Sequence, residues 1–339
     1  MQASTLPPFV ALAMGDPCGI SPELTARLLA DEQVAKAARL QVIGDARILA
    51  MGAADAGLDI DLPSAEGRSA QAPGHALIDL GNLDPADITR GEVSLAGGRF
   101  ALGNFEHALT MAREGQTEAV TFTPFNKQAM RLALPGYDDE VGVITKTLQA
   151  ATDGREFNIL EGLWNARVTS HIPLKDVSAA LSVERIHEAA VLANHCLREA
   201  GVSTPRIAVA ALNPHAGDGG AFGREEIDLI EPAIARMKQD GLNVTGPVPA
   251  DTVFVRAHKG EFDAVLTMFH DQGQIAMKLL GFERGVTYMG GYAVPIATPA
   301  HGTAYDIAGK GIADMNASRN AILLAANMVA TRRAAKAAA

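Results

Sequence analysis

The chain has 339 residues, 48% of them hydrophobic and 20% charged, which is enough for a sizeable core and favours two domains. Its net charge of −10 argues against non-specific binding to nucleic acid, although a few local cations or a metal could still hold a small anion. The sequence has no run of 18 apolar residues, no signal-peptide pattern and only two cysteines, Cys18 and Cys196, which predicts a cytoplasmic protein without a membrane segment.

Apolar strand-like runs alternate with helix-like runs along almost the whole chain. Strands are predicted at residues 9–14, 41–45, 76–81, 118–125, 166–170, 206–212 and 263–269. Helices are predicted from residue 21 into the early thirties, over 93–113, 182–201, 224–241 and 271–281, and from Asn316 or Ser318 toward the C-terminus. This alternation predicts an α/β fold with a mostly parallel sheet.

Three histidines each follow an apolar run: His171, His215 and His270. Ligands bind open α/β sheets in the crevice outside the carboxyl ends of the strands. Three neutral imidazoles there could bind a metal and leave a position open for substrate. The alternative is that the three are unrelated polar residues at strand ends.

Three glycine-rich segments lie between predicted strands and helices. Residues 15–23 (GDPCGISPE) could bind an anion at a helix N-terminus or form only a structural turn. Residues 215–226 do not fit G-x-G-x-x-G, because Phe222 stands where the third glycine is needed, so this loop is interpreted as a flexible support for His215. Residues 301–314 could form a cofactor loop or a simple connection. Among the lysines, Lys127, Lys175 and Lys278 lie near predicted strand ends, with plain solvation as the alternative.

Together the motifs resemble those of the 4-hydroxythreonine-4-phosphate dehydrogenase family and its paralogues, which act in or near pyridoxine biosynthesis. The motifs occur in the family order: MGDPCGISPE (14–23), TPFNK (123–127), SHIPLKD (170–176), LNPHAGDGG with FGREE (212–226), PADT (249–252), FHDQG (269–273) and HGTAYDIAGKG (301–311). The family is more distantly similar to isocitrate and isopropylmalate dehydrogenases.

The resemblance implies two α/β/α domains and an active site in the cleft between them at a homodimer interface. We assign residues 1–145 with 297–339 to the cofactor-side domain, and residues 146–296 to the dimerisation and metal-binding domain. The resemblance implies a divalent metal on His171, His215 and His270, with ligands from both subunits. Zinc is the first choice, and Mg, Mn, Co, Ni and Fe are alternatives.

The same resemblance implies oxidation of a secondary alcohol by NAD, followed by decarboxylation of the β-keto acid. The metal would lower the pKa of the substrate hydroxyl and then stabilise the enolate. The candidates for proton transfer, or for hydrogen bonds to the ligand imidazoles, are Lys127, Lys175, Asp251 and Asp271. The candidate cofactor residues are Asp16, His301, Asp306, Ile307 and Asn316. In the larger fold group, an Asp-Ile pair such as Asp306-Ile307 is typical of NAD rather than NADP enzymes.

The chain departs from the family where the substrate phosphate is held. Tyr137 and Asp138 replace a His-Thr pair, and Thr287 and Ile296 replace an Asn and an Arg, while Lys278 matches a substrate-binding lysine. Losing Arg and gaining Asp beside a dianion is electrostatically unfavourable, so we expect a different substrate, with an unphosphorylated one as an option. The alternatives are the 4-phosphohydroxy-L-threonine reaction itself, a cis-dihydrodiol dicarboxylate as in terephthalate catabolism, and a non-catalytic metabolite-binding paralogue.

Overall fold

The computed structural model describes residues 6–65 and 72–338, which fall into two compact units. The first unit combines Met1–Arg155 with Val286–Ala339, and the second is Glu156–Gly285. From the sequence, we placed the two crossings, the points at which the chain passes between the domains, at 145/146 and 296/297. The structure places the second crossing earlier because β10 (Val286–Gly290) and β11 (Ile296–Pro299) pair as antiparallel neighbours and stay in one unit.

In the first unit, helices lie on both faces of a six-stranded arrangement. Its strands are β1 (Phe9–Ala13), β2 (Arg39–Gly44), β3 (Ala76–Asp79), β4 (Ala119–Phe122), β10 and β11, in the order β3-β2-β1-β4-β11-β10. Its helices are α1 (Ser21–Leu29), α2 (Glu32–Ala37), α3 (Ala46–Ala56), α4 (Leu95–Arg113), α5 (Lys127–Ala133), α6 (Glu140–Leu148) and α12 (Asn316–Ala338). All neighbouring pairs except β10–β11 are parallel, so their carboxyl ends meet at one edge.

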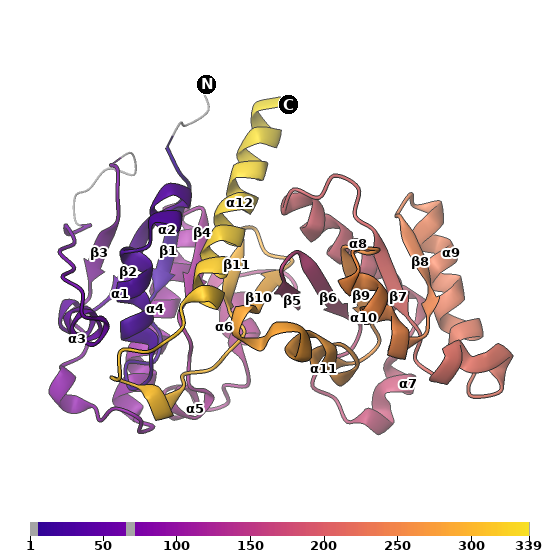
Figure 1. Ribbon diagram of the computed structural model, residues 1–339, viewed down its shortest axis with the longest axis horizontal. Coiled ribbons are helices and arrows are strands. Elements are labelled where there is room, and N and C mark those ends of the chain that lie inside the picture. The colour runs from indigo at the N-terminus through magenta and orange to yellow at the C-terminus, as the bar shows by residue number, and fades with distance from the viewer. Residues whose placement is uncertain (1–5, 66–71, 339) are drawn as a thin grey trace. The chain divides into compact units, whose positions relative to one another are not determined.

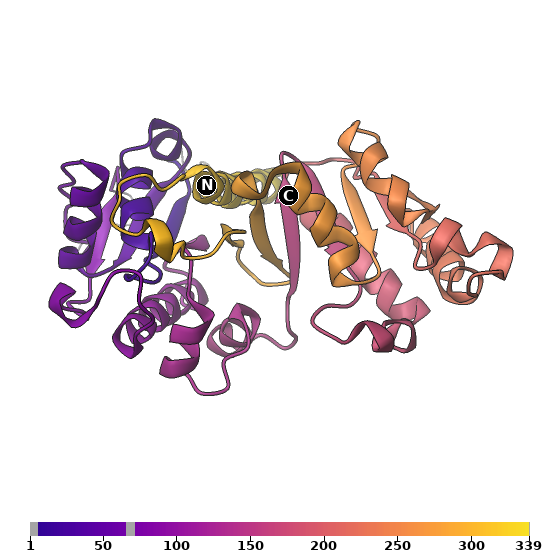
Figure 2. The same ribbon diagram turned by 60° about the horizontal axis from the view of Figure 1, so that its bottom comes forward.

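The core of the first unit follows the two-residue period of a strand. In β1, Val10 and Leu12 belong to a cluster with Ile322 of α12, whereas Ala11 and Ala13 belong to a cluster with Phe105 of α4. Figure 2 shows the strands between the helix α12 and the helices α4, α5 and α6. Both faces of the strands are therefore buried, as parallel sheets require.

The second unit repeats this arrangement on a smaller scale (Figure 1). Its strands are β5 (Arg155–Leu160), β6 (Leu163–Arg167), β7 (Ile207–Ala210), β8 (Val244–Val248) and β9 (Ala264–Thr267), in the order β5-β6-β9-β7-β8. Its helices are α7 (Val177–Ala180), α8 (Val183–Glu199), α9 (Glu231–Gln239), α10 (Ala250–His258) and α11 (His270–Gly281). Strand β5 is antiparallel to β6, and the other neighbours are parallel.

Alternation along β7 again separates two faces. Ala208 and Ala210 pack in a cluster with Phe254 of α10 and Met277 of α11, while Val209 between them is equally buried on the other side. The predicted α/β class with two α/β/α domains is therefore confirmed. Within residues 6–65 and 72–338, no helix combines the length and apolarity needed to cross a bilayer.

Candidate functional site

The three histidines lie at one edge of the second unit. Strands β6, β9 and β7 are consecutive parallel neighbours, so their carboxyl ends meet at the same edge. His171 follows β6, His270 begins the helix after β9, and His215 follows β7. The strand pattern in the sequence therefore predicted the edge correctly, and the strand order puts His270 just after β9, the central strand of the three.

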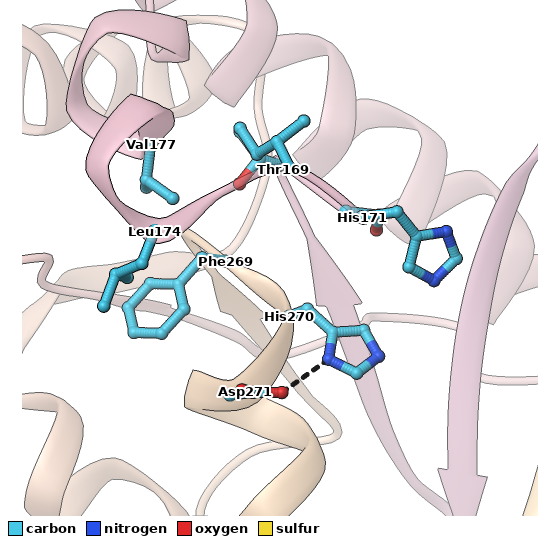
Figure 3. Close-up of a pocket in the computed structure, with 9 residues that line it drawn as sticks. Thr169, His171, Leu174, Val177, Phe269, His270 and Asp271 are labelled. Atoms are coloured by element: carbon cyan, nitrogen blue, oxygen red, sulfur yellow. Dashed lines mark hydrogen bonds and ion pairs between the residues drawn. The ribbon is translucent and has the colours of Figure 1, made fainter.

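His171 and His270 are brought together. Their ring centroids are 5.6 Å apart, with the ring planes at 47°. The Nδ1 of His270 lies 2.7 Å from Oδ1 of Asp271, an interaction drawn as a dashed line in Figure 3. Because a carboxylate only accepts, His270 donates from Nδ1, which leaves the Nε2 lone pair as its ligand position. A carboxylate that fixes an imidazole in this way is the usual companion of a metal-binding histidine.

A cavity of about 300 Å³ opens beside this pair. It is lined by Thr169, Ser170, His171, Ile172, Leu174, Val177, Phe269, His270 and Asp271. Figure 3 shows Leu174, Val177 and Phe269 on one side of the view and the two imidazoles on the other. A largely apolar wall facing a few polar groups is typical of a small-molecule site, because burial supplies affinity and the polar groups supply orientation.

His215 is placed differently. It is exposed, has φ of 52° and lies with its ring centroid 6.2 Å from that of Phe222. In the part of the chain that the structure describes, no three His, Cys, Asp or Glu side chains are arranged to hold one metal ion. One chain thus brings two of the three predicted ligands together, and the role of all three as ligands stays a prediction.

Three other predicted residues of the second unit lie on its surface. Lys175 lies in the short turn Leu174–Asp176 after His171, Asp251 lies in the first turn of α10, and Lys278 lies on α11; all three are exposed. Within the described ranges, none of the three is among the residues that line the cavity. Their proposed roles in proton transfer or substrate binding stay predictions.

In the first unit, the turn after β1 fastens a distant loop. Asp16, which is 1% exposed, accepts hydrogen bonds at Oδ1 from the Cys18 N–H and at Oδ2 from the Tyr305 hydroxyl, at 2.8 and 2.6 Å. Burial raises the pKa of the Asp16 carboxyl. Burial also raises the pKa of the Cys18 thiol to about 11, so this thiol stays protonated near neutral pH and is a poor nucleophile.

Helix α1 holds the rest of this loop. The Ile20 N–H donates to the Thr303 carbonyl, the Ala313 N–H donates to Glu23, and Arg27 donates to the Gly311 carbonyl. These bonds fix both ends of residues 303–313. The structure leaves Asp306 exposed between them, where a ligand could reach it, while Ile307 packs on the cluster of Ile20, Leu24 and Ala313.

Two further cofactor candidates flank this loop. His301 has Nδ1 at 3.0 Å from the Gly302 carbonyl, and its Nε2 is buried without a hydrogen-bond partner among the described residues. Asn316 begins α12, and its side-chain oxygen accepts from Arg319. The role of either residue toward a cofactor stays a prediction.

The substrate candidates of the first unit divide into buried and exposed residues. Ile296 is fully buried in β11, and Tyr137 is 4% exposed with its hydroxyl donating to Glu140. Asp138 is exposed, as is Lys127 at the start of α5, and Thr287 is half-buried in β10. The positions that replace the family's His and Arg therefore carry core side chains, and we expect them to shape the site rather than to bind charge.

Sequence patterns did not identify three polar residues that support these segments. Tyr305 binds Asp16 across the fold; Gln272 accepts from Met268 N–H and donates to the Ala211 carbonyl. Glu226 is 1% exposed and accepts from the loop before His215. Each lies inside a quoted motif, but each has a partner in another segment of the chain, so periodicity and spacing could not assign it.

The family model and the similar sequences point to the same protein family. Residues 36–325 match the model of the family described as the pyridoxal phosphate biosynthetic protein PdxA. A Rhizobium meliloti protein with the provisional name 4-hydroxythreonine-4-phosphate dehydrogenase 2 is 59% identical, over 98% of this chain and 96% of its own length. The D-threonate 4-phosphate dehydrogenase of Cupriavidus necator is 35% identical, over 96% of this chain and 98% of its own.

Solved structures of related dehydrogenases resemble that of this chain. The 4-hydroxythreonine-4-phosphate dehydrogenase of Klebsiella pneumoniae superposes with a TM-score of 0.82 at 35% identity, covering 96% of this chain and 99% of that one. A terephthalate 1,2-cis-dihydrodiol dehydrogenase from Burkholderia xenovorans superposes with a TM-score of 0.67 at 30% identity, covering 94% and 98%. The predicted family resemblance is therefore confirmed.

Proposed function

Because the chain belongs to the family of the pyridoxal phosphate biosynthetic protein PdxA, we propose that it is a metal-dependent, NAD-linked dehydrogenase of a small hydroxy acid. It oxidises a secondary alcohol, and decarboxylation of the resulting β-keto acid follows. The observation that carries this proposal is the pair of imidazoles of His171 and His270 beside a cavity. The carboxylate of Asp271 lies against the Nδ1 of His270.

The donor set suits a divalent transition metal. Neutral imidazoles are good ligands for zinc, and also for Co, Ni and Fe, and Asp271 leaves His270 in the tautomer that ligates through Nε2. We assign His171, His270 and His215 as the ligands, with one of them supplied by a second copy of the chain. When bound, the metal would polarise the substrate oxygen in both the alcohol and the ketone.

The remaining groups bind, orient and transfer protons. Lys175, close in sequence to His171, and Lys127 are the candidates for moving the hydroxyl proton. Asp306 is our candidate acceptor for hydrogen bonds from the adenosine ribose of NAD. The loop that carries it is fixed at both ends and its carboxylate is exposed, which supports this assignment. The apolar wall of Leu174, Val177 and Phe269 would exclude water from the reacting carbon.

The substrate is proposed to be a small anionic hydroxy acid other than 4-phosphohydroxy-L-threonine. Relatives are named for 4-hydroxythreonine 4-phosphate, D-threonate 4-phosphate and a terephthalate cis-dihydrodiol, so the family accepts several acids. In this chain, Ile296 is buried and uncharged where the family has an arginine, and Asp138 adds a negative charge. Both changes disfavour a dianionic phosphate at that position and support a different acid.

We also propose a cytoplasmic homodimer. Helix α11, which begins with His270, carries Ile275 and Leu279 at 61% and 83% exposure on one face, four residues apart. Apolar side chains exposed together on the helix of a proposed ligand fit an interface between two copies. Light scattering of the purified protein would give the mass directly, and a monomer at micromolar concentration would contradict this assignment.

The experiment that tests the activity is NADH formation across a panel of acids. The panel contains 4-phosphohydroxy-L-threonine, D-threonate 4-phosphate, D-threonate and a terephthalate cis-dihydrodiol, each with and without added Zn²⁺, Mn²⁺ or Co²⁺. We expect one acid to be oxidised only with metal, and His171→Ala, His215→Ala and His270→Ala each to lose orders of magnitude in turnover. His195→Ala, at an exposed histidine on α8, is the matched control.

Two results would overturn the proposal. One is full turnover and full metal content in His215→Ala or His171→Ala. The other is 4-phosphohydroxy-L-threonine as the best substrate of the whole panel, which would restore the pyridoxine-pathway reaction.

A further inference from the structure

The loop that carries His215 has an unusual backbone. Five consecutive residues, 215–219, have left-handed φ values between 44° and 80°, and His215, Ala216 and Asp218 among them are not glycine. L-residues visit this region singly and at a cost, because Cβ approaches the following carbonyl oxygen. Such a turn persists only where surrounding contacts fix it, so its anchors are informative.

One buried carboxylate holds the entry to this turn. Oε1 of Glu226 accepts the backbone N–H groups of Leu212 and Asn213 at 2.8 and 2.7 Å, and Oε2 accepts the Asn213 side-chain amide at 2.9 Å. Glu226 is 1% exposed. The turn also passes directly against it, since a Cβ on Gly217 would lie 2.7 Å from Oε2.

All three groups that Glu226 contacts here are donors. An ionised carboxylate only accepts hydrogen bonds, so it satisfies all three donors. The NH₂ group of a glutamine at this position would be a donor facing the NH₂ group of Asn213, and no hydrogen bond could form between the two. Glu226 can reach the loop because its helix starts with a wide turn, in which Glu231 N–H donates to the Glu226 carbonyl. Pro232, the next residue, lacks an N–H and so cannot continue the normal α-helical ladder there.

The polar side chains near Glu226 bind other groups and do not anchor the backbone directly before His215. Gln272 binds Met268 and Ala211, which fastens the end of β9 to the end of β7 ahead of the turn. Glu225 accepts from Asn213 and from Ser178, which lies after the His171 loop. Among these described contacts, only those of Glu226 hold the backbone N–H groups directly before Pro214 and His215.

We propose that Glu226 is the positioning residue for His215: its carboxylate fixes the left-handed turn and thereby the place of the imidazole. Because Glu226 is 1% exposed and its carboxylate is bound within the chain, we assign it no contact with a metal or a substrate. This inference rests on the proposed function of His215 as a ligand, but it concerns a contact within this chain and can be measured without turnover.

The test compares Glu226→Gln with Asp228→Asn. Asp228 is an acid on the same helical segment, 52% exposed and paired with Arg224, so its amide variant is a matched control. We expect Glu226→Gln to speed amide hydrogen exchange in residues 211–220. It should also weaken binding of Co²⁺, measured calorimetrically, by about 10-fold or more, because the His215 imidazole would no longer be held in place. Asp228→Asn should change neither quantity.

The outcomes separate the two proposals. If the wild type binds no Co²⁺ and His171→Ala turns over normally, the metal proposal fails. If His215→Ala loses Co²⁺ while Glu226→Gln keeps wild-type exchange and affinity, only the positioning role fails. Should circular dichroism show Glu226→Gln to be unfolded, Asn213→Ala decides. It removes the side-chain amide that donates to Oε2 of Glu226 and to Glu225, and it leaves the backbone donors to Oε1 of Glu226 in place. Wild-type Co²⁺ affinity in this variant would refute the role.

Discussion

The hydroxyl of Tyr305 donates to the buried carboxylate of Asp16 at 2.6 Å, joining two residues that are 289 positions apart. Asp16 lies in the glycine-rich turn after β1, and Tyr305 lies beside Asp306 in the loop proposed to bind NAD. Because Ala304 before it has φ of 44°, the loop reaches Tyr305 through a left-handed residue, which this hydrogen bond helps to hold.

Tyr305→Phe should loosen this loop. A hydrogen bond to a charged acceptor contributes about 1.5–3 kcal/mol, and the Asp16 oxygen left behind stays buried. We expect a loss of that order in the free energy of unfolding by urea, together with a higher KM for NAD at nearly unchanged kcat. Tyr292→Phe, at another buried tyrosine of the same unit, is the control: it should lower stability without raising KM for NAD. An unchanged KM in Tyr305→Phe would remove the bond from cofactor binding.

Asp16→Asn should change how stability depends on pH. Burial raises the folded-state pKa of Asp16 above its ordinary value of 3.8. The folded state therefore favours the protonated form, and the stability this gives is fully present below the unfolded pKa and lost as pH rises through the folded pKa. An asparagine does not titrate, so the wild type should lose stability relative to Asp16→Asn as pH rises from acid to neutral.

The free energy of unfolding of the wild type and of Asp16→Asn is measured at about pH 4 and at about pH 7. At each pH the difference between the two proteins is taken, and the two differences are compared. A difference that stays constant, or that moves in favour of the wild type at neutral pH, would show that the carboxylate is not penalised by burial.

Most of the strands and helices, and the edge of the sheet at which the three histidines lie, could be predicted from the sequence because they depend on local patterns. Apolar runs with helices between them predicted the parallel strands, and the histidines after β6, β7 and β9 lie at one edge as expected. Gly98 in α4 has a packing reason that the sequence does not reveal: a Cβ on it would lie 2.1 Å from the Ala129 carbonyl oxygen of α5.

What could not be predicted depends on long-range contacts. Spacing cannot reveal that Tyr137 would be buried in the cluster with Phe105 of α4, or that Ile296 would lie inside the sheet rather than in a pocket. The domain crossing moved because a hairpin, β10–β11, keeps its two strands together. Three histidines at strand ends also do not determine their separations, and the structure brings only His171 and His270 together on one chain among the described residues.

Asp271→Asn should weaken metal binding rather than abolish it. The carboxylate accepts the Nδ1 proton of His270, and a neutral amide could do so less strongly or favour the other tautomer. We expect about a 10–100-fold loss in Co²⁺ affinity, the usual effect of removing a ligand's partner. Asp228→Asn, at an exposed acid paired with Arg224, should retain wild-type affinity. If the two variants bind Co²⁺ equally well, Asp271 has no role in orienting His270.

The preference between NAD and NADP rests on Asp306. Its exposed carboxylate can accept hydrogen bonds from the ribose hydroxyls of NAD, but it would repel the 2′-phosphate of NADP, and Ile307 beside it packs on α1 and offers no compensating charge. We expect kcat/KM to favour NAD by about 10-fold or more, on the order of 1.4 kcal/mol.

Asp306→Asn should narrow this preference mainly by improving the use of NADP, because it removes repulsion while keeping an acceptor. Asp314→Asn, at an exposed acid that caps α12 at the far end of the same loop, should leave the ratio unchanged. Equal or better use of NADP by the wild-type protein, or an unchanged ratio in Asp306→Asn, would remove Asp306 from the cofactor site and leave it as a residue of a structural turn.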